Sequence, residues 1–178
     1  LTSEGLEQSF ALLLASPSLL TQKLRPLLKG HHTPSRVINV VSGGMYTEKL
    51  VCDRLIMVPP HYQGAKAYAR AKRALTVLSE LWAEQWRKDG IIVNAMHPGW
   101  ADTPGVASAL PTFRSITRRI LRTSEEGADT IIWLAKAKEA GGLSGRLFLD
   151  REPRTPPHRA SRPRRERSRR TTAGGRAD

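Results

Sequence analysis

Cysteine is almost absent from this chain, which has a single one, Cys52, among 178 residues. One cysteine forms no disulfide within the chain and finds no second cysteine for a metal site. This usage is typical of a reducing compartment, so we expect a cytoplasmic protein. The chain also lacks an apolar run approaching the ~20 residues that a membrane-spanning helix needs, and no basic segment precedes its best candidate, at 10–14. We therefore expect no membrane partner.

The excess of positive charge is concentrated at the end of the chain. Residues 151–178 hold ten arginines and three acids, a net charge of +7, whereas residues 1–150 carry +6. Because alanines are its only apolar residues, this Arg/Pro-rich segment cannot bury enough surface to fold, and we expect a disordered tail. Arginine-rich tails neutralise nucleic-acid phosphates, but this one has neither a lysine nor an aromatic residue to stack on a base. We therefore expect no nucleic-acid partner.

Hydrophobic periodicity predicts alternating helices and strands in residues 1–150, a length that suits one domain. A helix is expected over 4–29, capped by Thr2 or Ser3 and bent or broken at Pro17. Nearly continuous apolar residues at 36–42 and 91–96 are typical of strands buried on both faces of a parallel sheet. This order favours an α/β fold with right-handed crossovers. The other expected elements are helices at 63–88, 107–121 and 123–137 and a short strand at 146–150.

Tyr68 and Lys72 form a candidate reactive pair because they stand four residues apart on a predicted helix and so face the same side. A phenol ordinarily titrates near ~10, and a neighbouring cation favours its ionised form. A hydroxyl at a strand end, such as that of Ser42, could hold a substrate carbonyl nearby. Together these groups could protonate an alkoxide, or deprotonate an alcohol in the reverse direction.

The same Tyr-x-x-x-Lys spacing occurs a second time, at Tyr62 and Lys66. For either copy the plainest interpretation is an exposed aromatic beside a solvated lysine. We favour the copy at Tyr68 because an uninterrupted amphipathic helix follows it, whereas Gly64 lies inside the other one.

The segments before and after the pair at Tyr68 and Lys72 make its interpretation as a reactive pair more specific. The segment RVINVVSGG ends a strand at Ser42, YARAKRAL follows on a helix, and NAMHPGWADTPG ends the next strand. In this combination and order, residues 1–150 resemble the short-chain dehydrogenase/reductase family. The segments HPGWADTPGV and VVSGGM and the 26-residue gap from Ser42 to Tyr68 look most like its subgroup named dehydrogenase/reductase SDR family member 12.

The resemblance implies a part of a Rossmann-type, doubly wound parallel sheet and an NAD(P)-dependent oxidoreductase acting on a small carbonyl or secondary alcohol. It implies that Ser42 orients the substrate oxygen and that Tyr68 is the general acid/base. Lys72 would lower the tyrosine pKa and bind the nicotinamide ribose. Pro98-Gly99 would form the turn beside the nicotinamide, and Thr103 would contact its carboxamide. By the same resemblance, the helices at 4–29 and 63–88 are candidate homo-oligomer faces.

The sequence departs from this family at two places. It has neither Gly-x-Gly-x-x-Gly nor Thr-Gly-x-x-x-Gly-x-Gly, the turn that places a helix N-terminus on the pyrophosphate. We expect the missing first part of the fold to precede Leu1, which leaves the choice between NAD and NADP open. Leu13 also stands where the family usually has a catalytic asparagine. An inactive, enzyme-like interaction module is therefore the alternative to an oxidoreductase.

Overall fold

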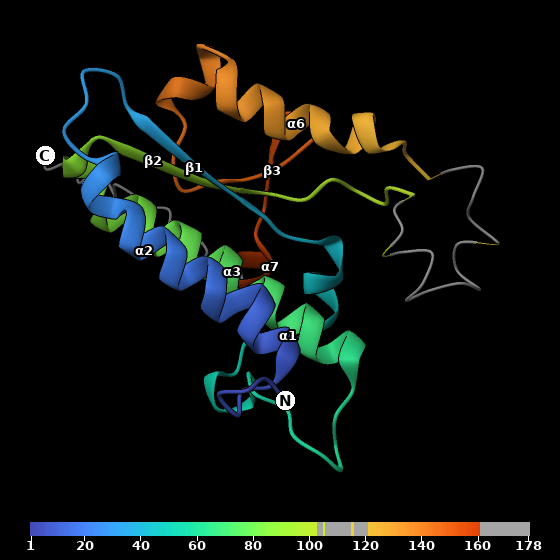
Figure 1. Ribbon diagram of the computed structural model, residues 1–178. Helices are drawn as coiled ribbons and strands as arrows, with labels where there is room; N and C mark the ends of the chain where they lie inside the picture. The colour runs from blue at the N-terminus through green and yellow to red at the C-terminus, as the bar shows by residue number, and fades with distance from the viewer. Residues whose placement is uncertain (103–104, 106–114, 116–120, 161–178) are drawn as a thin grey trace, which may run out of the picture.

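The computed structural model describes residues 1–102, 105, 115 and 121–160. They form a three-layer α/β arrangement in which helices cover both faces of a sheet, as the sequence predicts (Figure 1). The sheet order is β1 (Ser35–Val40), β2 (Ile91–Met96), β3 (Leu147–Leu149) and β4 (Glu152–Arg154). The first three strands are parallel, and β4 runs antiparallel to β3. The expected α/β class is thus confirmed.

The first helical layer begins at the N-terminus, where α1 (Gln8–Phe10), the π-helix η1 (Ala11–Ala15) and α2 (Ser16–Leu28) follow one another. Its cap is Glu7, whose carboxylate accepts from the amides of Ser9 and Phe10, rather than the expected Thr2 or Ser3. Pro17 does not break the helix. Proline lacks an N–H group, and the wider π turn just before it lets the helix continue without that donor.

The helix α3 (Gly64–Gln85), extended by the 3-10 turn η4 (Arg87–Asp89), lies beside α2 on the same face of the sheet (Figure 1). Its buried face follows the period of an amphipathic helix, and it includes Leu75 and Trp82. Trp82 stacks on Trp86 at 5.4 Å between ring centroids. This face and the α1–α2 layer enclose the larger of two apolar clusters.

The helix α6 (Ser124–Lys136) covers the opposite face of the sheet. It begins with a capping box in which Thr123 accepts from the Glu126 amide and Glu126 accepts from the Thr123 amide, as the sequence indicates. Leu134 packs with Met96 and Phe148 in the second apolar cluster. Further short helical segments are η2 (Gly43–Thr47), η3 (Cys52–Arg54), η5 (Glu139–Gly142) and α7 (Pro157–Ala160).

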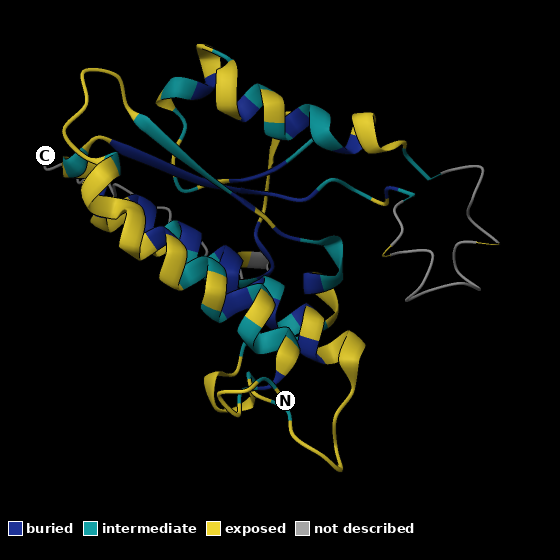
Figure 2. Ribbon diagram, in the orientation of Figure 1, coloured by how far each residue is buried: buried dark blue, intermediate teal, exposed yellow. Residues whose placement is uncertain are grey.

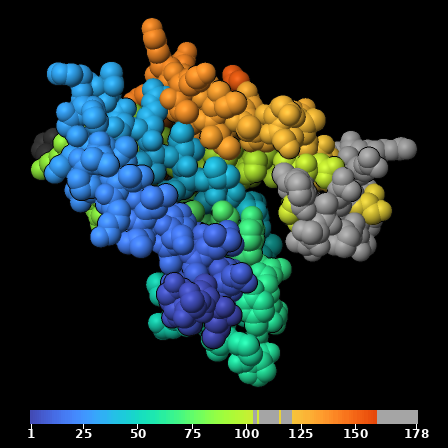
Figure 3. Space-filling view, viewed as in Figure 1, coloured from blue at the N-terminus to red at the C-terminus, as the bar shows by residue number. Residues whose placement is uncertain are grey.

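The two predicted central strands differ in burial. Every residue of β2 is buried, whereas most of β1 is only half-buried (Figure 2). The expectation of two-faced burial therefore holds for β2 and is wrong for β1. The reason is that no described strand pairs with the outer edge of β1, which reaches the surface between α2 and α6 (Figure 3).

The chain does not become irregular at Arg151, where we placed the start of the disordered tail. Asp150 and Arg151 have φ angles of 56° and 59° and form the two-residue turn of a hairpin that returns as β4. The short helix α7 then docks on α3, where His158 and Arg159 contact the Glu80 carboxylate. These contacts order residues 152–160, while 161–178 lie outside the described residues. Among the residues that are described, no helix is long and apolar enough to cross a bilayer.

Candidate active site

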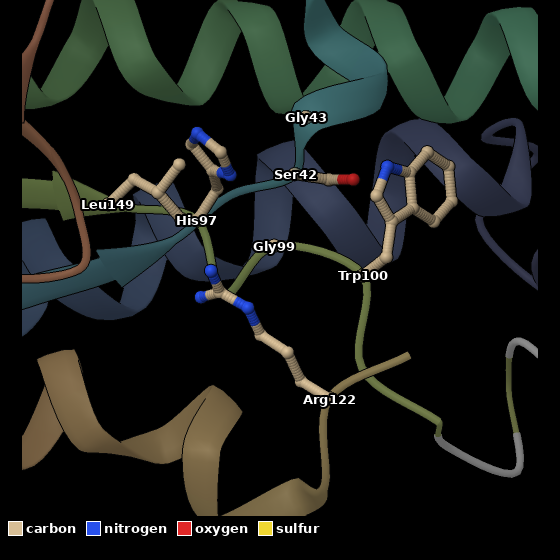
Figure 4. Close-up of a pocket in the computed structure, with 7 residues that line it drawn as sticks. All are labelled: Ser42, Gly43, His97, Gly99, Trp100, Arg122 and Leu149. Carbon is tan, nitrogen blue, oxygen red and sulfur yellow. The ribbon is translucent and has the colours of Figure 1, made fainter. Parts of the chain in front are cut away.

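The candidate site lies where β1 and β2 end, beside the first turns of α3. The two strands are parallel and in register from Ser35 with Ile91 to Val40 with Met96, so the residues that follow them meet at one edge of the sheet. A hollow of ≈ 340 Å³ opens there (Figure 4). It is lined by Ser42, Gly43, His97, Gly99, Trp100, Arg122 and Leu149.

Ser42 and Tyr68 converge on Gly44. A Cβ atom added at Gly44 would lie 3.6 Å from the Ser42 hydroxyl oxygen and 3.8 Å from Cε1 of the Tyr68 ring. Ser42 also caps η2, because its hydroxyl accepts a hydrogen bond from the Gly44 amide at 3.2 Å. Tyr68 is 38% exposed, so part of the residue is in contact with solvent. Two residues 26 positions apart thus face one small space.

Lys72 lies one helical turn after Tyr68, with its ammonium nitrogen 5.9 Å from the centroid of the phenol ring. The ammonium donates a hydrogen bond of 2.9 Å to the Val40 carbonyl at the end of β1. Burial lowers the pKa of Lys72, because removing water disfavours the charged amine. The predicted trio of Ser42, Tyr68 and Lys72 is therefore brought together by the fold.

The alternative pair at Tyr62 and Lys66 lies elsewhere. The Tyr62 hydroxyl is 3.1 Å from the Ser9 hydroxyl, near the start of α1. Gly64 begins α3, so Tyr62 precedes the helix, and the spacing of this pair does not place both residues on one helical face.

Three side chains of α3 tie the loop after Ser42 to the helix that carries Tyr68. The buried guanidinium of Arg73 donates to the Glu48 carbonyl at 2.5 Å, and Arg70 pairs with the Glu48 carboxylate at 2.9 Å. The Thr76 hydroxyl donates to the Met45 sulfur. Burial lowers the pKa of Arg73, whose charge is held here by backbone carbonyls. Sequence reasoning did not find this brace, since it depends on contacts across more than 20 residues.

His97 lies in the wall of the hollow. The residue is 8% exposed, and its buried Nδ1 has no hydrogen-bond partner among the described residues. Burial is the main reason that its pKa is lowered, with Arg122 and Arg154 adding to the effect and Asp150 opposing it. The ring packs edge-on against Tyr46, with 6.3 Å between centroids.

The Pro98-Gly99 turn follows His97 directly. Gly99 has a φ angle of +75°, a conformation that favours glycine, and a Cβ there would lie 3.1 Å from the Arg122 guanidinium. Arg122 was not among the predicted residues, although it fills the floor of the hollow beside this turn. Thr103, the remaining predicted contact, lies outside the described residues, as does most of the helix expected at 107–121.

Leu13, at the place of the usual family asparagine, lies inside the π-helix η1. Its half-buried side chain packs against the apolar cluster around Leu75 and so contributes to the core. No group of three or more potential metal ligands occurs among the described residues.

Comparison with known proteins gives a consistent result. Residues 1–148 match the family model described as Enoyl-(Acyl carrier protein) reductase. The chain is 44% identical over 154 residues to human dehydrogenase/reductase SDR family member 12 and 42% identical to its Bos taurus counterpart. Polyprenol dehydrogenase of Danio rerio is 34% identical over 157 residues. These matches cover 86%, 86% and 83% of this chain but 48% of each relative, so the chain spans about half their length.

Solved structures agree on the fold. The TT0495 protein of Thermus thermophilus has 26% identity and a TM-score of 0.58, covering 83% of this chain and 59% of that one. The Pseudomonas aeruginosa RhlG/NADP active-site complex has 24% identity and a TM-score of 0.58, covering 78% and 55%. With an α/β sheet of this topology and a family model that matches most of its length, the chain belongs to the short-chain dehydrogenase/reductase family.

Proposed function

We propose that this chain supplies the catalytic part of an NAD(P)-dependent oxidoreductase that interconverts a small carbonyl compound and a secondary alcohol. The observation that carries the proposal is the convergence of Ser42 and Tyr68 on Gly44, with Lys72 one helical turn behind the phenol. A hydroxyl, a phenol and an ammonium around one open space can bind a carbonyl oxygen and deliver a proton to it.

The residues present fit the nicotinamide end of a dinucleotide. The Lys72 ammonium lies at the end of β1. Gly99, the second residue of the Pro98-Gly99 turn, lines the hollow together with Ser42. The carboxyl ends of parallel strands are where α/β folds bind such ligands. The pyrophosphate end would need the glycine-rich turn, which is not part of this sequence.

Each residue of the trio has a separate task in this mechanism. When bound, the nicotinamide supplies a hydride to the carbonyl carbon or takes one from the alcohol carbon. The Ser42 hydroxyl donates a hydrogen bond to the substrate oxygen and holds it near the phenol. The Tyr68 hydroxyl gives its proton to that oxygen as negative charge develops there. Lys72 stabilises the phenolate that remains, and Tyr68 takes the proton back in alcohol oxidation.

An interaction module without turnover is the second candidate function. Leu13 favours it, because a leucine side chain cannot hold the water that the usual asparagine holds in this family. The two candidates differ in one measurement, since a module without turnover would keep its fold and lack any oxidation of NADPH or NADH above background.

The test compares two matched variants, Tyr68→Phe and Tyr62→Phe, in this chain preceded by a glycine-rich strand–turn–helix segment. Each variant removes one hydroxyl from a tyrosine followed by Lys at the fourth position. We expect Tyr68→Phe to lower kcat by about 100-fold or more, as removal of a general acid does, and Tyr62→Phe to leave it within about threefold. The readout is NADPH or NADH absorbance with a panel of small ketones and aldehydes.

Loss of activity only in Tyr62→Phe would overturn the assignment of Tyr68. Full activity in both variants would overturn acid/base catalysis by either tyrosine. An inactive parent protein that still binds dinucleotide would favour the interaction module.

A further inference from the structure

We propose that Arg122, held by Asp150, is a positioning residue that fixes the Pro98-Gly99 turn at the floor of the site. The inference rests on the proposed function for its catalytic meaning. The contacts of Arg122 and Asp150 from which it is argued do not depend on that function. They come from three segments that lie far apart in the sequence: the end of β2, the residue before the α6 cap, and the β3–β4 hairpin.

The backbone of Arg122 is bound to the strand extension that follows the turn. Its amide donates to the Trp100 carbonyl at 2.9 Å, and its carbonyl accepts from the Asp102 amide at 2.8 Å. These two hydrogen bonds form an isolated parallel bridge between Ala101 and Arg122, outside the strands of the sheet. The bridge fixes the position of the Arg122 backbone relative to the Pro98-Gly99 turn.

The side chain of Arg122 then folds back over the turn itself (Figure 4). Its Nη1 donates to the Pro98 carbonyl at 3.3 Å. A Cβ on Gly99 would lie 3.1 Å from both Nε and Cζ of the guanidinium, tighter than nine in ten real contacts of this kind. A side chain on Gly99 would therefore require the guanidinium to shift by a few tenths of an ångström.

Asp150 holds the other side of the guanidinium. Its two carboxylate oxygens accept from Nη1 and Nη2 of Arg122, the second at 2.8 Å, in the bidentate geometry that fixes both direction and plane. This hydrogen bonding lowers the pKa of the Asp150 carboxyl, so the pair stays ionised at neutral pH. Because Asp150 neutralises it, Arg122 acts here as a structural cation.

Asp150 is itself fixed by the hairpin turn. The neighbouring Arg151 is bound to α6 through its backbone, because its amide donates to the Thr130 hydroxyl at 3.1 Å, a hydrogen bond that does not depend on the Arg151 side chain. Both turn residues have positive φ angles, a conformation that needs such support in residues other than glycine. The chain of contacts runs from α6 through the hairpin to Arg122 and ends at Pro98.

The same hairpin offers a matched control. Arg151 with Asp129 is a second forked Arg–Asp pair, one residue along the chain from Asp150 and with the arginine somewhat more exposed than Arg122. The hydrogen bonds of its guanidinium go to α6 and not to the Pro98-Gly99 turn. Arg122→Met and Asp150→Asn remove the proposed clamp, Arg122→Lys keeps the charge and loses the fork, and Arg151→Met removes the control pair.

The first measurement is amide hydrogen exchange in this chain, which needs no cofactor. We expect the Asp102 amide to exchange about tenfold faster in Arg122→Met, and less than that in Arg122→Lys and Asp150→Asn, while β2 amides such as Ala95 are unchanged. Arg151→Met should leave Asp102 as in the parent. The clamp would be overturned if the Asp102 amide exchanged equally fast in Arg122→Met and the parent. It would also be overturned if Arg151→Met accelerated this exchange as much as Arg122→Met, or if the Asp102 amide of the parent were unprotected.

The second measurement asks whether the clamp serves the site. In the chain preceded by a glycine-rich segment, we expect Arg122→Met to raise KM for the dinucleotide by about tenfold and to change kcat less. Arg122→Lys should raise this KM less than Arg122→Met does. A uniform loss of folded protein, with unchanged KM in what remains, would contradict a positioning role. An inactive parent would count against the proposed function, and the exchange data would still decide the clamp.

Discussion

Some residues of the site combine an ionisable side chain with a buried position, which disfavours charge. His97 is the clearest case, because it is ionisable, is only 8% exposed and lies in the wall of the hollow beside Ser42. In the part of the chain that the structure describes, nothing hydrogen-bonds to its Nδ1. Burial favours its neutral form, so His97 adds no charge to the wall of the hollow. The consequence is a dependence of stability on pH.

We expect the free energy of unfolding to fall as pH is lowered from about 7 to about 5, partly because of His97. Its pKa in the folded chain lies below the ordinary 6.5, so the unfolded state binds the proton more readily and acid favours unfolding. His97→Gln should reduce this slope. Urea unfolding at several pH values measures it, and His31→Gln, an exposed histidine, is the control. An unchanged slope in His97→Gln would contradict the assignment.

Gly99 is fixed by both its backbone and its surroundings. Gly99→Ala should cost about 1–2 kcal/mol of unfolding free energy, because alanine is disfavoured at positive φ and its Cβ would press on Arg122. Gly142→Ala has no neighbour within 4 Å of the added carbon and is the matched control. Denaturant titration measures the free energy of unfolding of both variants. Equal values would contradict the prediction, because they would show that the Pro98-Gly99 turn accommodates a Cβ atom without cost.

At the scale of elements, local sequence signals account for most helix boundaries. The capping box places the start of α6 at Ser124, and the buried face of α3 follows the helical period of its apolar residues. The start of α1 was predicted wrongly, because the helix is capped by the Glu7 carboxylate and not by a hydroxyl group. Short-range contacts of this kind are readable from sequence whenever the capping residue is of an ordinary type.

Thr123→Ala tests the cap of α6. It should lower the free energy of unfolding by about 1 kcal/mol, because the Glu126 amide loses its acceptor. Thr155→Ala, at an exposed position outside the helices, should have little effect. Chemical denaturation of both variants provides the comparison, and a larger loss in Thr155→Ala would argue against the capping energy.

At the scale of the whole molecule, the open edge of β1 is the dominant feature. The strand is only half-buried, and its outer edge is not paired by any part of the chain that the structure describes. Unpaired strand edges are templates for association with other chains. The sequence also lacks the turn that would hold a pyrophosphate.

We therefore expect the isolated chain to be marginally stable and to bind dinucleotides weakly. Thermal unfolding followed by circular dichroism should show a low, concentration-dependent midpoint that excess NADPH or NADH does not move. A ligand stabilises a fold only when its concentration exceeds its dissociation constant. A cooperative transition that either dinucleotide shifts upward by several degrees would refute this expectation.

The sequence by itself determined the α/β class, the span of β2, the inward face of α3 and the Tyr68–Lys72 pair, because each depends on residues within a few positions of one another. Tertiary structure decided what depends on distant contacts. It placed Ser42 beside Tyr68 and not Tyr62, left β1 at an edge, and joined Arg122 to Asp150. Those contacts follow from the register of parallel strands and the return of the hairpin, which no local spacing encodes.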